Sequence, residues 1–184
     1  MKEACVRKSK LSADAVEVLQ PEIRADDVVL CKNREEVETR LFYPATPLKY
    51  KNHMFVLRAL KKMKDKGTLG ALKLDLTLNG TENELSQSLL RYVQEFQLPV
   101  CFCGILPRQE VMERYASSTL IFPSYIETFG LPLLEARKSD TCVIASDCSF
   151  SREILEGYDA AWFFDPFDEN QLIDILEKFT KNNG

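Results

Sequence analysis

The chain has 184 residues, of which 45% are hydrophobic and 28% are charged, and its formal net charge is -4 at pH 7. This length and composition are those of one globular domain with a short additional segment, and they allow one substantial hydrophobic core. The negative charge provides no overall basic field for a phosphate backbone, which argues against general nucleic-acid binding.

The sequence carries no sign of secretion or membrane insertion. No apolar segment approaches the roughly 20 residues of a membrane-spanning helix, and the first residues lack the apolar core of a signal peptide. We therefore expect a cytoplasmic protein without a transmembrane segment, and peripheral attachment to the inner face of the membrane stays open.

Six cysteines occur in the chain. Without a secretion signal, reduced thiols are favoured over a disulfide framework. Cys101 and Cys103 alternate on one predicted strand face, and no Cys-x-x-Cys pair occurs. Because the chain also has a single histidine, we expect buried apolar thiols and no bound metal.

The first 38 residues differ from the rest of the chain. They combine a helical pattern from Glu3 to Leu11 with a short extended run from Val16 to Leu19, which ends before Pro21. This pattern indicates a connector over residues 1–38 and a single domain over residues 39–184.

From residue 39 onward, short apolar runs alternate with amphipathic helices. The predicted strands are 41–43, 72–78, 99–102, 120–122, 142–145 and 161–164. The predicted helices are 53–66, 84–96, 108–116, 130–138, 150–155 and 169–179. Ser151 and Asp168 are candidate N-caps of the last two helices.

Strict alternation with short connections predicts an α/β fold with a doubly wound parallel sheet of about six strands, covered by helices on both faces. Right-handed crossovers place the carboxyl ends of all strands at one edge, where such sheets bind ligands. We therefore expect functional residues in the loops that follow Tyr43, Leu78, Phe102, Phe122 and Ile144.

The segment from Phe122 to Ala136 joins a strand to a helix and carries the strongest chemical signal. Gly130 can bring the backbone close to a ligand, and Pro132 suits a first helical turn. Unpaired amides at that helix start would bind an anion such as a pyrophosphate. Along a helical path, Glu127 and Glu135 would be separated by about 12 Å, so one could meet the sugar and the other the ribose of a nucleotide sugar. The alternative is an acidic helix start that only complements the helix dipole.

The run Glu127-Thr128-Phe129-Gly130-Leu131-Pro132-Leu133-Leu134-Glu135 resembles the glutamate-pair motif of retaining GT-B glycosyltransferases of family 4. The likeness extends to residues 104–110, 115–118, 143–147 and 164–168, and it covers about residues 39–179. It implies a Rossmann-like fold, a single GT-B half-domain that binds the donor, preceded by the inter-domain segment of such enzymes. In the family, the first glutamate contacts the donor sugar and the second binds the ribose, and these roles pass to Glu127 and Glu135.

The resemblance also implies further donor-binding residues. Lys51 aligns with a lysine that binds the donor diphosphate, where its ammonium would offset charge on the departing phosphate. The backbone of Ile105 and Leu106 resembles the base-binding turn, and Arg108 flanks it. The predicted donor site is completed by the loop residues Thr128, Phe129, Gly130 and Leu131.

Other polar and aromatic residues are open to a structural interpretation. The family often has an arginine after its first strand, where this chain has Pro44-Ala45-Thr46-Pro47, and Lys49 could compensate. Lys49, Lys51 and Arg108 could also be solvated surface charges. His53 begins a predicted helix and is interpreted as a capping or packing residue, and the aromatic run 162–164 as sheet core.

Several motifs are absent. The sequence has no G-x-G-x-x-G, Walker or G-x-S-x-G motif, which argues against nicotinamide, P-loop and serine hydrolase chemistry. No Asp-x-Asp follows a strand in a way that suggests a metal-held diphosphate, so we expect no cofactor, and lysine with backbone amides would hold the nucleotide-sugar substrate.

The resemblance implies a glycosyltransferase donor domain that transfers a sugar, with retention, to a saccharide or lipid-linked acceptor in polysaccharide biosynthesis. Only the donor half matches, so a truncated enzyme that needs a separately encoded acceptor-domain protein is expected. The alternative is a noncatalytic module that binds a nucleotide sugar or a partner protein. A sugar-nucleotide epimerase would need a catalytic histidine with paired carboxylates, which these residues do not assemble.

Overall fold

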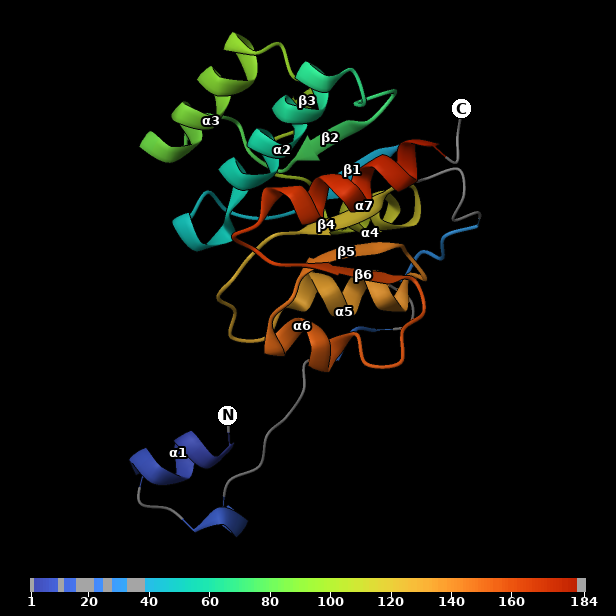
Figure 1. The fold of residues 1–184 in the computed structure, drawn as a ribbon. Helices are drawn as coiled ribbons and strands as arrows, with labels where there is room; N and C mark the ends of the chain where they lie inside the picture. The colour runs from blue at the N-terminus through green and yellow to red at the C-terminus, as the bar shows by residue number, and fades with distance from the viewer. Residues whose placement is uncertain (1, 10–11, 16–21, 25–27, 33–38, 182–184) are drawn as a thin grey trace.

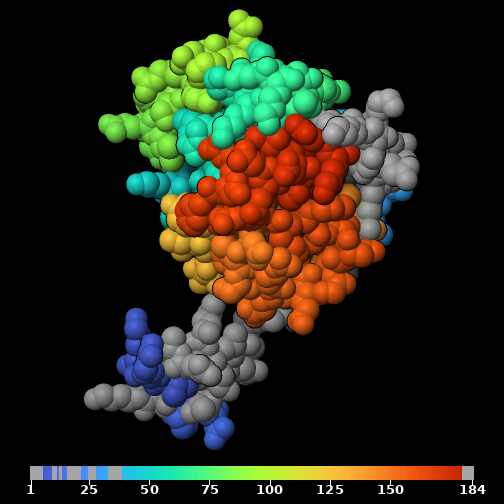
Figure 2. All heavy atoms as spheres, in the orientation of Figure 1, coloured from blue at the N-terminus to red at the C-terminus, as the bar shows by residue number. Residues whose placement is uncertain are grey.

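The computed structural model describes residues 2–9, 12–15, 22–24, 28–32 and 39–181 (Figure 1). In the connector, α1 (Lys2–Ser9) and the short 3-10 helix η1 (Ala13–Ala15) lie away from the sheet (Figures 1 and 2). The predicted extended run from Val16 to Leu19 falls outside the described residues, as does the predicted boundary at residue 38. Two connector segments contact the domain through hydrogen bonds. The Lys138 ammonium donates to the Ile23 carbonyl, and the Cys31 amide donates to the Ser139 carbonyl.

Six strands form one parallel sheet in the order β3-β2-β1-β4-β5-β6, which confirms the predicted α/β fold. The strands are β1 (Arg40–Tyr43), β2 (Lys73–Leu76), β3 (Val100–Phe102), β4 (Thr119–Phe122), β5 (Val143–Ser146) and β6 (Ala161–Phe164). All residues of β4 and β5 are buried, as expected for central strands covered on both faces.

Helices cover both faces of the sheet (Figure 1). One layer contains α2 (His53–Lys66), α3 (Glu84–Glu95) and α7 (Glu169–Lys181), and the other contains α4 (Arg108–Ala116), α5 (Leu131–Lys138) and α6 (Ser149–Ile154). A short 3-10 helix, η4 (Lys49–Lys51), lies between β1 and α2. None of the helices in the described residues is long and apolar enough to cross a bilayer.

The two predicted helix caps have different outcomes. The Asp168 carboxylate accepts a hydrogen bond from the Asn170 amide at 3.0 Å, so this cap is confirmed. The predicted cap at Ser151 is wrong, because the N-cap of α6 is Cys148, three residues earlier, and Ser151 is buried inside the helix. A serine is compatible with either place in such a short helix, so its identity did not locate the boundary.

The sequence predicted buried thiols, and among Cys31, Cys101, Cys103, Cys142 and Cys148 only Cys142 is buried. Cys101 is exposed and Cys103 half-buried, although they share a strand face as predicted. The physical reason is that β3 is an edge strand, so its side chains are not enclosed by neighbours on both sides. At the opposite edge, β6 buries Phe164 fully and the other two aromatics of the run partly, which agrees with the predicted sheet core.

Candidate functional site

The strand order places a switch point between β1 and β4. From there the chain runs outward through β2 and β3 on one side and through β5 and β6 on the other. Ligands of doubly wound sheets bind in the crevice at such a switch point, beyond the carboxyl ends of the strands. Lys51 follows β1 and Glu127 follows β4, so both predicted residues lie at this crevice.

Lys51 and Glu127 contact each other directly. The Lys51 ammonium forms an ion pair with Oε1 of Glu127, and their side chains are only 15% and 12% exposed. The ammonium also lies 5.9 Å from the centre of the Phe122 ring. The family resemblance assigns these residues to different parts of a ligand, whereas in the free chain each neutralises the other.

Hydrogen bonds hold the two sides of the crevice together. The Tyr43 hydroxyl donates to the Lys51 carbonyl at 2.9 Å. The Tyr125 amide and the Ser124 hydroxyl both donate to the Tyr50 carbonyl, at 3.1 and 3.2 Å. The loop after β4 is thereby fixed against η4, which positions the ion pair before any ligand arrives.

The start of α5 offers free backbone donors. Gly130 precedes the helix with φ of 77°, a conformation that favours glycine. In the part of the chain that the structure describes, no hydrogen bond involves the amides of Thr128, Phe129, Gly130 and Leu131. The expected helical path between the two glutamates is wrong for its first half, because the helix begins only at Leu131.

Glu135 is buried within α5, at 3% exposure, and is held by two residues of α4. Its Oε1 forms an ion pair with Arg108, and its Oε2 accepts a hydrogen bond from the Tyr115 hydroxyl at 2.9 Å. Burial and the neighbouring Glu135 charge raise the pKa of Tyr115 well above its usual value, so the phenol stays a donor. This role of Tyr115 was not predicted from the sequence. Its spacing of seven residues from Arg108 was an available signal, since this interval places two residues on one helix face.

The Ile105–Leu106 turn borders a hollow of about 380 Å³ at the carboxyl ends of β1 and β2. The hollow is lined by Pro44, Ala45, Thr46, Thr77, Ile105, Leu106 and Val111. Ile105 is 89% exposed, so its side chain is accessible to a ligand at this hollow. An apolar hollow beside exposed backbone suits a flat, partly polar ring such as a nucleobase.

The remaining candidates contribute less to the crevice. His53 is buried and packs against the Tyr43 ring, with ring centres 4.8 Å apart, in agreement with a packing role. Burial lowers its pKa to about 4, so it is neutral at physiological pH. The side chain of Lys49 is exposed. Within the described ranges, the one cluster of three metal-ligating side chains is Asp75 on β2 with Cys101 and Cys103 on and after β3, and it does not include Lys51, Glu127 or Glu135.

The sequence of this chain was compared with protein families and with curated proteins. The profile of the family described as Glycosyl transferases group 1 matches residues 32–184. None of the curated proteins compared with the chain matches it.

Several solved structures share the fold. Sucrose-phosphate synthase from Thermosynechococcus elongatus is 19% identical with a TM-score of 0.75, over 98% of this chain and 50% of that protein. HepE from Anabaena, in complex with UDP and glucose, is 14% identical with a TM-score of 0.75, over 96% and 50%. A glycosyltransferase from Rickettsia africae is 15% identical with a TM-score of 0.68, over 100% and 42%.

The chain spans half or less of the length of these three proteins. Its six-stranded parallel sheet is the part that it shares with them, and the family profile covers most of its residues. The chain therefore belongs to the glycosyl transferases group 1 family, and its fold is the Rossmann-like half-domain of the GT-B glycosyltransferases.

Proposed function

We propose that this chain binds the nucleotide-sugar donor of a retaining glycosyltransferase at the carboxyl ends of β1 and β4. The observation that supports this most directly is the meeting of Lys51, Glu127 and the free amides before α5 at one switch point. An ammonium and helix-start amides attract phosphate, whereas a carboxylate repels it. A single ligand that satisfies all three carries a diphosphate next to an uncharged hydroxylated group, as a nucleotide sugar does.

The ion pair suggests how the donor enters. The diphosphate competes with Glu127 for Lys51 and also takes up the free amides, which releases the Glu127 carboxylate towards the sugar. There the carboxylate stabilises positive charge that develops at the reacting carbon, while Lys51 stabilises negative charge on the departing phosphate. Glu127 is the catalytic residue in this proposal, and Lys51 both binds the donor and assists its departure.

The nucleoside extends towards α4. Glu135 retains acceptor capacity beyond its contacts with Arg108 and Tyr115, because a carboxylate offers about four lone-pair sites, so it can accept from ribose hydroxyls. The base occupies the hollow at Ile105 and Leu106. HepE structures in complex with UDP and with UDP-glucose support a nucleotide sugar as the ligand class.

The acceptor lies outside this chain in the proposal. The chain spans half or less of the length of its structural neighbours, and in the proposal a second, acceptor-binding domain completes the cleft and excludes water. A saccharide or lipid-linked acceptor is the part of the proposal that rests on the family resemblance, and the cytoplasmic location rests on the apolar pattern of the sequence.

Isothermal titration calorimetry tests the donor site. The purified chain is titrated with UDP, GDP and ADP, each with and without a chelator. At least one of the three is expected to bind with the same affinity in both conditions, because lysine and amides carry the phosphate charge. Binding of none of them, or binding only with a divalent metal, would contradict the proposal.

A further inference from the structure

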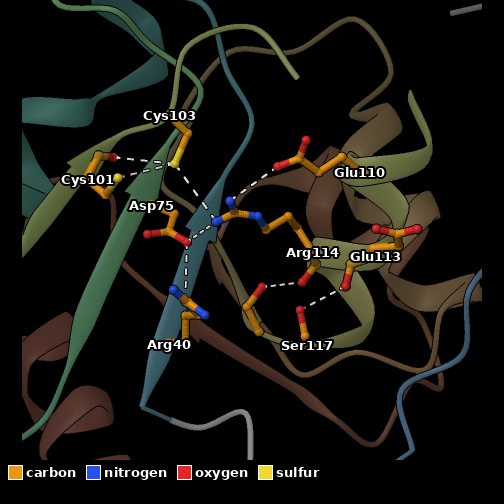
Figure 3. Close-up of polar contacts among 9 residues, drawn as sticks. Arg40, Asp75, Cys101, Cys103, Glu110, Glu113, Arg114 and Ser117 are labelled. Atoms are coloured by element: carbon orange, nitrogen blue, oxygen red, sulfur yellow. Dashed lines mark hydrogen bonds and ion pairs between the residues drawn. The ribbon is translucent and has the colours of Figure 1, made fainter. Parts of the chain in front are cut away.

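The β3 edge of the sheet gathers two thiols and a carboxylate beside the site already described (Figure 3). Cys101 lies on β3 and Cys103 directly follows it, and both point towards Asp75 on the neighbouring strand β2. Cys101 is exposed and Cys103 half-buried, so solvent reaches the pair. The proposed sugar transfer makes no use of these three side chains.

The thiols have the spacing that a single metal ion requires. Their sulfur atoms lie 3.6 Å apart, and with one Asp75 oxygen they all lie within 4.8 Å of one another. A tetrahedral Zn²⁺ with bonds of about 2.3 Å to sulfur separates two sulfurs by about 3.8 Å. A disulfide would need about 2.0 Å, so the sulfurs would have to close by roughly 1.6 Å. The free chain is therefore already close to the geometry of the metal-bound pair.

Asp75 is oriented as a ligand by two arginines. Its Oδ2 forms ion pairs with Arg114 and with Nε of Arg40, the latter at 3.3 Å, and neither contact involves Oδ1 (Figure 3). Arg114 also lies 3.9 Å from the Cys103 sulfur and 3.3 Å from Glu110. Outer-shell partners of this kind fix the orientation of metal-ligating carboxylates.

We propose that Asp75, Cys101 and Cys103 bind one thiophilic divalent cation of the Zn²⁺ class, with water as the fourth ligand. Thiolate sulfur selects such ions over Mg²⁺ or Ca²⁺. Each thiol releases its proton to solvent and donates an electron pair to the ion. The two arginines and Glu110 then leave the filled cluster without net charge, which lowers the cost of holding a cation beside guanidinium groups.

The bound ion would tie the edge strand β3 to β2. Cys103 directly precedes Gly104, which leads into the turn of Ile105 and Leu106. The ion would therefore stiffen the backbone that borders the proposed base hollow, although sugar transfer itself does not require it.

Calorimetric titration with ZnCl₂, under a phosphine reductant that keeps the thiols reduced, tests the site. The full chain is compared with a Cys101→Ser/Cys103→Ser variant and with a matched Cys31→Ser/Cys148→Ser control, since those two cysteines are also free and half-buried. The wild type and the control should each bind one ion per chain. The Cys101→Ser/Cys103→Ser variant should bind it more than about 100-fold more weakly, because even outer-shell changes cost 10- to 100-fold.

A cobalt titration identifies the ligands by a second readout. Co²⁺ should give sulfur-to-metal charge-transfer absorption in the wild type and the control but not in the Cys101→Ser/Cys103→Ser variant. Zinc binding that survives in this variant, or that is lost equally in the control, would overturn the proposal.

Discussion

At the residue scale, the candidate site consists of charged groups that are already paired. Lys51 is engaged by Glu127, and Glu135 is engaged by Arg108 and Tyr115. Partly buried charges destabilise a protein unless they are paired. The charged side chains of a donor site that excludes water therefore pair with each other when no ligand is bound. A ligand then binds by exchanging partners, and the two glutamates should respond differently to substitution.

Substitution of the two glutamates separates these roles. Glu127→Gln should strengthen binding of a bare nucleoside diphosphate several-fold, because Lys51 no longer has to leave an ion pair whose side chains are only 15% and 12% exposed. Glu135→Gln should weaken it about tenfold, since a charged acceptor for the ribose becomes neutral. Both affinities are measured by calorimetry after thermal unfolding has shown that the variants are folded. Loss of nucleotide binding in Glu127→Gln but not in Glu135→Gln would show that the roles are assigned wrongly.

His53 should make the stability of the domain depend on pH. Burial, with a smaller effect of Lys51, lowers its pKa to about 4 in the folded chain, against the ordinary value of 6.5 for a histidine in water. The unfolded chain therefore binds a proton between these values that the folded chain does not, and stability is lost as the pH falls from about 6.5 to 4. The loss attributable to this residue is about 3 kcal/mol.

Urea unfolding at pH 7.5 and pH 4.5 measures this contribution. The wild type should lose more stability between the two values than His53→Gln, whose side chain does not titrate. Other groups also change protonation between the two pH values, and the comparison between the two proteins removes their shared effect. An equal loss in both proteins would contradict the account of His53.

At the element scale, the connection from β4 to α5 depends on one glycine. A Cβ at Gly130 would lie 3.2 Å from Ile154 and 3.3 Å from Leu133, in addition to the strain of a positive φ. Gly67, at the end of α2, has a similar φ of 72° but open space around it. A side chain at either position would be strained by the positive φ, but only at Gly130 would it also crowd its neighbours. Gly130 is also close in the sequence to Glu127, whereas Gly67 is not.

Alanine at each position tests this comparison. Gly67→Ala should cost about 1 to 2 kcal/mol, the penalty of a left-handed conformation, and leave nucleotide binding unchanged. Gly130→Ala should cost about 1 kcal/mol more and also weaken nucleoside diphosphate binding, because the free amides before α5 are displaced. Denaturant unfolding and calorimetry give the two quantities. A Gly130→Ala variant that binds as tightly as the wild type would show that these amides do not hold the ligand.

Local signals predicted some elements closely and others poorly. The bounds of α2 and α4 agree with the sequence prediction, since Gly67 ends one helix and Pro107 precedes the other. The start of α6 was predicted wrongly, because a helix of six residues has too few turns for its apolar periodicity to locate its first residue. The exposure of Cys101 was predicted wrongly, because the residues of an edge strand do not show in the sequence that the strand lies at the edge. The contacts of Lys51 with Glu127 and of Arg108 with Glu135 join separate loops and helices, so local patterns could not predict them.

At the scale of the whole molecule, the fold explains why residues so far apart in the sequence form one crevice. Lys51 and Glu127 are separated by 76 positions, and the order of the strands brings them to the same switch point. The alternation of strands and helices was enough to predict a parallel sheet and the edge at which it binds ligands. The family, in contrast, could be predicted only from the motif between Glu127 and Glu135. We propose that this one crevice, and no other hollow among the described residues, receives a nucleotide sugar.

Backbone amide NMR during titration with a nucleoside diphosphate is the sharpest test of this proposal, because it reports on every part of the surface in one experiment. The nucleotide that binds most tightly in calorimetry is added to the isotope-labelled chain. The largest chemical-shift changes should fall on residues 51, 105–106 and 127–131, and the hollow beside Arg152 and Tyr158 should be unaffected. Changes concentrated at that second hollow, or shifts that leave residues 127–131 unmoved, would contradict the account.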